Sequence, residues 1–131
     1  MADELILMIE DNEKNRKLMR DVLQFQGYKT AESENAEEGL RMAGALAPAL
    51  ILMDIHLPGM NGIEALGALR ADPATRGIPV MAVTASVMPQ DRQMVTSAGF
   101  DAYQSKPINV KEFVAAVKEL LKRPRKAGKS P

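Results

Sequence analysis

Residues 50–62 have the sequence LILMDIHLPGMNG, in which a short apolar run ends abruptly in an aspartate. An apolar run of this length is typical of a strand buried on both faces, as in a parallel sheet. The segment 58–62 that follows is rich in turn-forming residues, which predicts a loop. We therefore expect a buried strand whose carboxyl end presents Asp54 to a loop.

The same pattern recurs along the chain. Further strands are predicted over Leu5–Ile9, Tyr28–Ala31, Pro79–Val83 and Ala102–Ser105. Apolar residues at helical spacing predict helices from Asn12 to Gly27, about Asn35 to Pro48, Ile63 to about Arg70, about Met88 to Ala98, and Val110 to Leu121. Strands and helices that alternate in this way predict an α/β fold of the (βα)5 type, a doubly wound parallel sheet with helices on both faces.

Composition fits one globular domain. The chain has 131 residues, of which 46% are hydrophobic and 26% charged, and its 17 basic residues balance its 17 acidic ones. This balance favours neither nucleic acid nor a membrane as partner. The absence of cysteine excludes disulfides and thiol catalysis. With no signal-peptide pattern and no apolar run of the ~20 residues that cross a bilayer, we expect a cytoplasmic protein.

The end of the chain differs in composition. Residues 123–131 are basic and contain proline and glycine, which predicts a flexible tail after a domain over residues 1–122. Nucleic-acid binding by so short a tail is a weak alternative. Because no effector domain follows, we expect protein–protein output, unless the chain is a fragment of a longer protein.

Polar side chains stand at the carboxyl ends of the predicted strands. They are Glu10 and Asp11 after the first strand, Asp54 after the third, Thr84 after the fourth and Lys106 after the fifth. Doubly wound sheets bind ligands at this edge, so we expect these side chains to converge. The second strand ends in residues 32–34, Glu-Ser-Glu, which contribute nothing obvious to the site.

This set predicts a magnesium-dependent phosphoryl-transfer site. Neighbouring carboxylates repel unless a cation binds them, and Mg²⁺ prefers such oxygen ligands. We expect Asp11 to be a direct ligand and Glu10 to hold a metal-bound water. A carboxylate can itself be the nucleophile, and Asp54, at the centre of the set, is the predicted phosphoacceptor. Lys106 offers a positive charge and Thr84 a hydroxyl for the phosphoryl group.

Each residue also has an ordinary structural interpretation. An aspartate after a strand is often a helix cap or a turn residue, and Thr84 can be a strand residue or a cap. Lys106 can be a solvated lysine. His56 can be a loop residue, a general base or a metal ligand. Only the joint occurrence of these residues at alternating strand ends favours the functional interpretation.

The chain resembles the CheY-like receiver domains of response regulators from Glu4 to about Lys122. The resemblance is carried by ILMIEDN at 6–12, ILMDIHLPGMNG at 51–62, PVMAVTA at 79–85 and SKP at 105–107. Residues 10–15 and 106–108 are most similar to single-domain regulators of the DivK type and to receivers of hybrid kinases. The resemblance implies a flavodoxin-like sheet with strand order 2-1-3-4-5.

The resemblance also implies a phosphorelay switch in a two-component system rather than an enzyme with a separate substrate. Asp54 would accept phosphate from a sensor histidine kinase or a histidine phosphotransfer protein, and the chain would catalyse only this transfer and slow autodephosphorylation. The implied Mg²⁺ ligands are Asp11, Asp54 and the backbone carbonyl of His56, with Glu10 acting through water. Lys106 would contact the phosphoryl group.

The implied output is a conformational switch. Thr84 would move toward the phosphoryl group, Tyr103 would turn inward, and the Lys106–Pro107 bond would be cis. A surface formed by the predicted helix from Met88, the strand at 102–105 and the last helix would then bind a downstream protein. The expected state is a monomer or a weak phosphorylation-dependent dimer. His56 and Ser86 leave the lifetime of the phosphorylated state open.

Three other functions are disfavoured by particular residues. An FMN- or nucleotide-binding enzyme would need a Gly- or Ser/Thr-rich loop where residues 10–12 are Glu-Asp-Asn. An acid-nucleophile phosphatase would normally have a second aspartate where His56 stands. A scaffold that is never phosphorylated would not need Asp54, Thr84 and Lys106.

Overall fold

The apolar runs form one parallel sheet in the computed structural model, which describes residues 4–85, 93 and 97–122. The strands are β1 (Leu5–Ile9), β2 (Lys29–Ser33), β3 (Leu50–Asp54), β4 (Val80–Thr84) and β5 (Ala102–Ser105). Their order is β2-β1-β3-β4-β5, and every neighbouring pair is parallel. This confirms the doubly wound sheet of order 2-1-3-4-5.

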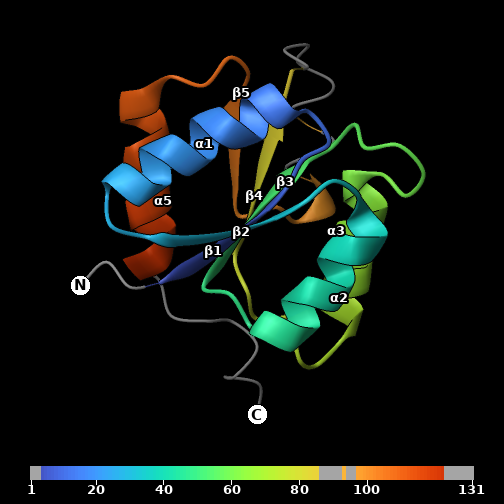
Figure 1. Cartoon of the computed structure of the whole chain (residues 1–131). Coiled ribbons are helices and arrows are strands. Elements are labelled where there is room, and N and C mark those ends of the chain that lie inside the picture. Colours follow the sequence, from blue (N-terminus) through green and yellow to red (C-terminus); the bar gives the residue numbers. More distant parts are fainter. Residues whose placement is uncertain (1–3, 86–92, 94–96, 123–131) are drawn as a thin grey trace.

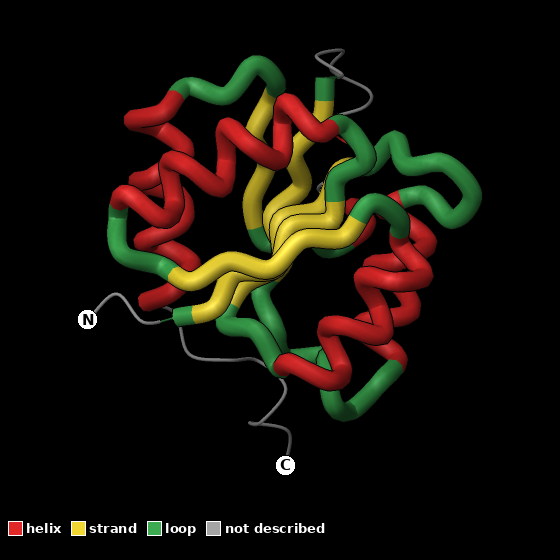
Figure 2. The backbone as a smooth tube through the Cα atoms, viewed as in Figure 1, coloured by secondary structure: helices red, strands yellow, loops and turns green. Residues whose placement is uncertain are grey.

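Helices cover both faces of the sheet (Figures 1 and 2). They are α1 (Glu13–Phe25), α2 (Ala36–Leu46), α3 (Gly62–Ala71) and α5 (Val110–Lys122). Asparagine side chains at positions 12, 35 and 61 cap the first three by accepting a backbone N–H three residues on, which explains where these helices begin. Helices α1 and α5 lie on one face, and α2 and α3 on the other. The predicted helix over Met88–Ala98 falls largely outside the described residues.

The core consists of two apolar layers, one on each face of the sheet. Alternate residues of the central strands contribute to opposite layers, so that Ile6 and Met8 pack with α1 and α5, while Leu7 and Ile9 pack with α2 and α3. Strands β1, β3 and β4 are almost completely buried. A backbone packed on both faces in this way is a rigid support for the side chains at its carboxyl end.

Strand β2 runs to Ser33, two residues beyond its predicted end at Ala31, and begins at Lys29 rather than at Tyr28. Weak alternation of apolar residues left its limits poorly defined, and the limits are set instead by parallel pairing along β1, from Leu5 with Lys29 to Ile9 with Ser33. The extension places Glu32 and Ser33 at the same edge of the sheet as the ends of β1 and β3.

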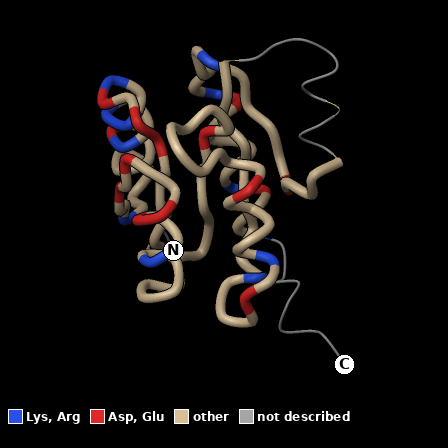
Figure 3. Tube along the Cα trace, turned by 90° about the vertical axis from the view of Figure 1, so that its right-hand side faces the viewer, with Lys and Arg blue, Asp and Glu red and all other residues tan. Residues whose placement is uncertain are grey.

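Charged residues of both signs are interleaved in the view of Figure 3. Within the described ranges, no helix combines the length and apolar character that crossing a membrane requires. The tail over residues 123–131 falls outside the described residues, so the proposed domain limit at residue 122 stays a prediction.

Candidate functional site

The loops after β1, β3 and β5 gather at one end of the sheet (Figure 1) and bring four charged residues together. Lys106 Nζ lies 2.7 Å from Glu10 Oε1 and 3.2 Å from Asp54 Oδ2. One carboxylate oxygen from each of Glu10, Asp11 and Asp54 lies within 4.8 Å of the others. We call these four residues the inner cluster. The convergence expected at the strand ends is thus present for these four residues.

Asp54 is held by the backbone around it. It is the last residue of β3 and is 5% exposed, and its Oδ1 accepts a hydrogen bond from the His56 backbone N–H at 3.0 Å. The Gly62 N–H donates to the Ile55 carbonyl at 2.9 Å, which closes the loop onto the strand end. A Cβ on Gly62 would lie 2.6 Å from the Asp54 carbonyl oxygen, so only glycine permits this approach.

Glu10 is 1% exposed and only partly satisfied by hydrogen bonds. Its Oε2 accepts the Asn12 backbone N–H at 3.2 Å. The other oxygen, Oε1, is buried and lies 2.7 Å from Lys106 Nζ in an ion pair, with no geometrically well-aligned hydrogen-bond donor within the described part of the chain. Lys106 is therefore the charged partner of this buried oxygen.

Burial and mutual repulsion oppose the negative charges of the inner cluster. Burial raises the pKa of Glu10, and the negative charge of Asp54 raises this pKa further. The contact with Lys106 lowers it, but the net pKa of Glu10 remains raised. Burial lowers the pKa of Lys106, but Glu10 and Asp54 outweigh that effect and the net pKa is raised. Three carboxylates thus face one ammonium group, and the cluster is short of positive charge.

This donor set fits a hard divalent cation. The side-chain candidate ligands are all carboxylate oxygens, one of them buried without an aligned hydrogen-bond donor, and Asp11 is exposed at the surface. Mg²⁺ takes one or two carboxylates and retains waters and phosphate oxygens, which matches a site with an open side. The residues present therefore suit the predicted metal.

The remaining predicted residues surround the cluster. Thr84 ends β4 and is fully buried, and its carbonyl accepts the Lys106 N–H at 2.9 Å. Tyr103 in β5 is half-buried and packs against Ile55 and Ala82. The Lys106–Pro107 bond is cis, which confirms that expectation. His56 is exposed, with its backbone N–H on Asp54. Ser86 and Met88 lie outside the described residues.

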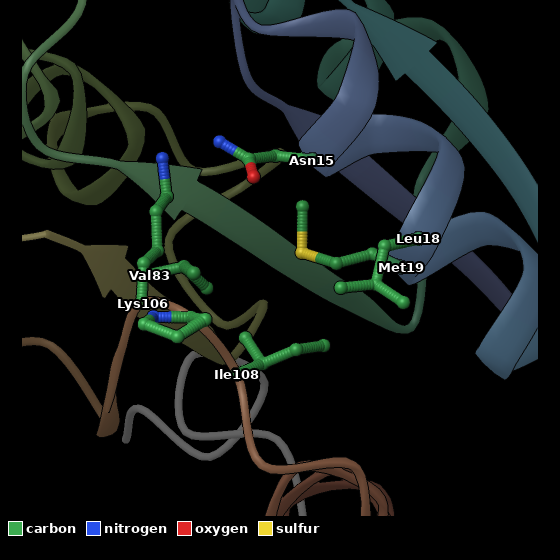
Figure 4. A pocket seen from close by; sticks show the side chains of 7 residues that line it. Asn15, Leu18, Met19, Val83, Lys106 and Ile108 are labelled. Carbon is green, nitrogen blue, oxygen red and sulfur yellow. The ribbon is translucent and has the colours of Figure 1, made fainter.

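A small hollow of about 40 Å³ opens beside Lys106, between α1 and the segment that follows β5. Figure 4 shows the polar ends of Asn15 and Lys106 on one side of it, with Met19 and Ile108 facing it from other sides. The stem of Lys106 thus borders open space beside the inner cluster.

Sequence reasoning missed Arg16, which belongs to the helical segment after the first strand. It is only 9% exposed, and its Nη1 donates to the Glu10 backbone carbonyl at 2.8 Å. It also contacts Glu32, so the end of β2 reaches the inner cluster only indirectly, through Arg16. A polar residue in an amphipathic helix gives no sequence signal of such burial.

Comparisons with known proteins agree with this geometry. The family model described as the response regulator receiver domain matches residues 6–118. The chain is 43% identical over 116 residues to the polar-differentiation response regulator DivK of Brucella anthropi, a match that covers 88% of this chain and 94% of that protein.

Solved structures show the same architecture. A putative response regulator of Chloroflexus aurantiacus superposes with a TM-score of 0.89 at 26% identity, covering 93% of this chain and 100% of that one. The receiver domain of a sensor histidine kinase of Pseudomonas aeruginosa gives a TM-score of 0.86 at 29% identity, with the same coverage of 93% and 100%. That structure contains a magnesium ion coordinated in its active-site cleft.

Proposed function

Because the chain belongs to the response regulator receiver family, we propose that Asp54 is the residue on which it accepts a phosphoryl group. Members of this family are two-component signalling switches and not enzymes with a separate substrate. The observation that carries the assignment is the position of Asp54, which is buried at the end of β3, within 4.8 Å of the other two carboxylates and 3.2 Å from Lys106 Nζ.

The transfer is a displacement at phosphorus. The Asp54 carboxylate attacks the phosphoryl group of a phosphohistidine, the P–N bond breaks as the O–P bond forms, and the imidazole leaves. Lys106, already 3.2 Å from Asp54 Oδ2, neutralises charge on the transferred oxygens. Positioning and charge neutralisation are what this reaction requires of a protein.

The acidic cluster is typical of the magnesium site of receivers. We assign Asp11, Asp54 and the His56 backbone carbonyl as ligands of Mg²⁺, with Glu10 acting through a bound water. When bound, Mg²⁺ supplies the positive charge that the inner cluster lacks and neutralises phosphoryl oxygens. The magnesium ion of the related Pseudomonas receiver supports this assignment.

The phosphoryl group on Asp54 carries about −1.5 to −2 charges in place of the single carboxylate charge, beside a buried threonine, and this provides the switch. Thr84 and Lys106 gain a new acceptor, and a conformation with Tyr103 turned inward becomes more populated. The responding surface consists of β5, α5 and residues 88–98. We assign a histidine kinase or histidine phosphotransfer protein as donor and a downstream protein as target, both in the cytoplasm.

Labelling with acetyl phosphate tests the proposal. Wild-type protein should incorporate phosphate in the presence of Mg²⁺ and not in the presence of EDTA. Asp54→Asn should abolish incorporation, because the nucleophilic carboxylate is replaced by an amide. Asp21→Asn, on the exposed face of α1, is the matched control and should label like wild type. Undiminished labelling of Asp54→Asn would refute the assignment.

A further inference from the structure

The end of β2 carries a second group of charged residues next to the inner cluster. Glu32 Oε1 lies 3.2 Å from Arg16 Nε, and Glu32 Oε2 lies 2.6 Å from Arg20 Nη1. Arg16 Nη2 is 3.8 Å from Glu34 Oε2. We call these four residues the outer cluster. Its two guanidinium groups are balanced by two carboxylates, so it has no excess charge.

Arg16 connects the two clusters. While its Nε donates to Glu32, its Nη1 donates to the Glu10 backbone carbonyl at 2.8 Å in a buried hydrogen bond. The guanidinium group is planar and rigid, so a carboxylate on one side fixes the direction in which the group donates on the other. The end of β2 thereby orients a donor aimed at the backbone of the inner cluster.

The carbonyl that Arg16 holds is well placed to control a metal ligand. It belongs to the peptide group joining Glu10 to Asp11, and because that group is planar, holding its oxygen fixes how the chain enters Asp11. On the preceding side, the Glu10 N–H donates to the Ser33 carbonyl at 2.9 Å. The peptide groups on both sides of Glu10 are thus anchored.

We propose that Arg16 is a positioning residue for the magnesium site, holding the turn at Glu10 and Asp11 in the geometry that binds the metal. The metal itself rests on the function proposed above, but Arg16 is not one of its ligands. Residues that orient ligands from behind typically change metal affinity by about 10- to 100-fold when they are replaced. The glutamates of the outer cluster neutralise Arg16, so its charge opposes the bound cation only weakly.

The sign of the effect separates positioning from simple electrostatics. Removing a positive charge near a cation site strengthens cation binding if charge alone acts. Loss of positioning weakens binding instead. Arg16→Met keeps an unbranched apolar stem but removes the donor to Glu10, and it should weaken Mg²⁺ binding about tenfold, measured by isothermal titration calorimetry on the full unphosphorylated chain.

Arg20→Met is the matched control. Arg20 lies one turn further along the same helix, carries the same charge and shares Glu32, but its contacts are with Glu32 and Asp21 rather than with Glu10. Arg20→Met should bind Mg²⁺ with the wild-type affinity. Unchanged or tighter binding by a folded Arg16→Met protein would overturn the proposal, as would equal weakening in both variants.

Arg16→Lys covers the case in which the methionine variant fails to fold. Lysine keeps the charge but lacks a planar group that contacts Glu32 and Glu10 together. A positioning role therefore predicts weaker Mg²⁺ binding, whereas an effect of charge alone predicts unchanged affinity. Wild-type affinity in Arg16→Lys would overturn the proposal. Acetyl phosphate labelling of the wild-type chain tests the proposed function separately. Calorimetry on the unphosphorylated protein measures Mg²⁺ affinity, which does not depend on phosphoryl transfer.

Discussion

The inner and outer clusters lie side by side at the carboxyl end of the sheet, yet they differ in charge balance. In the outer cluster, Glu32 receives a guanidinium on each of its carboxylate oxygens. In the inner cluster, Lys106 alone faces Glu10 and Asp54, and a buried oxygen of Glu10 accepts no hydrogen bond within the described residues. A balanced cluster holds structure, whereas one short of positive charge is prepared to bind a cation and a phosphoryl group.

Replacing Lys106 should have the largest effect, because it removes the only cation of the inner cluster. Lys106→Met leaves buried carboxylates uncompensated, and we expect it to lower the free energy of unfolding by about 3 kcal/mol without metal. Phosphoryl labelling should fall about 100-fold. Mg²⁺ should nevertheless bind about tenfold more tightly, since the ammonium no longer competes for the same carboxylates.

Urea denaturation, acetyl phosphate labelling and calorimetry measure these three quantities. Lys17→Met provides the control, because it removes the same charge from an exposed ion pair on α1. If Lys106→Met bound Mg²⁺ more weakly than wild type, the inner cluster would not be short of positive charge, and the contrast with the outer cluster would fail.

Moving Asp54 without changing any charge should have the next largest effect. A methyl group on Gly62 would press on the Asp54 carbonyl and on Ile55 Cα, at 2.6 and 2.8 Å. Gly62→Ala should therefore destabilise the fold by about 1–3 kcal/mol and slow labelling about tenfold. Thermal denaturation and labelling kinetics measure the two effects.

The matched control for this change is Gly67→Ala in the same helix. A Cβ there meets no atom within 4 Å, so helix propensity alone acts and stability should rise by up to about 1 kcal/mol. Equal labelling rates in the two variants would show that the backbone position of Asp54 matters little.

The smallest expected effect is a pH dependence of the metal-free chain. Because burial raises the pKa of Glu10, the folded chain holds this proton more tightly than the unfolded chain does. Protonation of Glu10 therefore stabilises the fold. This contribution is complete at pH values below 4.5, the ordinary pKa of glutamate, and it is lost as the pH rises through the raised pKa of Glu10 in the folded chain. Glu10→Gln, which mimics the protonated form, should be more stable than wild type at neutral pH in EDTA.

Urea denaturation between pH 7 and about pH 5 measures this difference, which should shrink as the pH falls. Asp11→Asn serves as the comparison, because it removes the same charge from an exposed carboxylate of the same turn. A wild-type chain more stable than Glu10→Gln at neutral pH would contradict a raised pKa at Glu10.

The fold and the convergence at the strand ends could be predicted because they depend on local patterns. Buried parallel strands are short apolar runs, and residues such as Asp54 and Thr84 mark their ends. Parallel topology then places those ends at one edge whatever the detailed packing. Asparagine caps at positions 12, 35 and 61 similarly fix where helices begin.

The missed features depend on contacts between distant segments. Arg16 occupies a polar position of an amphipathic helix, and only the pairing of β1 with β2 brings Glu32 and the Glu10 carbonyl within its reach. Gly62 was expected only as a loop residue, since its closeness to Asp54 depends on how the loop folds back. The ion pair of Lys106 with Glu10 needs the longer glutamate side chain and the observed strand order together.

Mapping the phosphorylated residue is the direct test of phosphoryl transfer to Asp54. Wild-type protein treated with acetyl phosphate and Mg²⁺ would be trapped with borohydride, digested and sequenced by mass spectrometry. We expect one modified aspartate, Asp54, and no modification in EDTA. Modification at Asp11 or at another aspartate, with Asp54 unmodified, would contradict it.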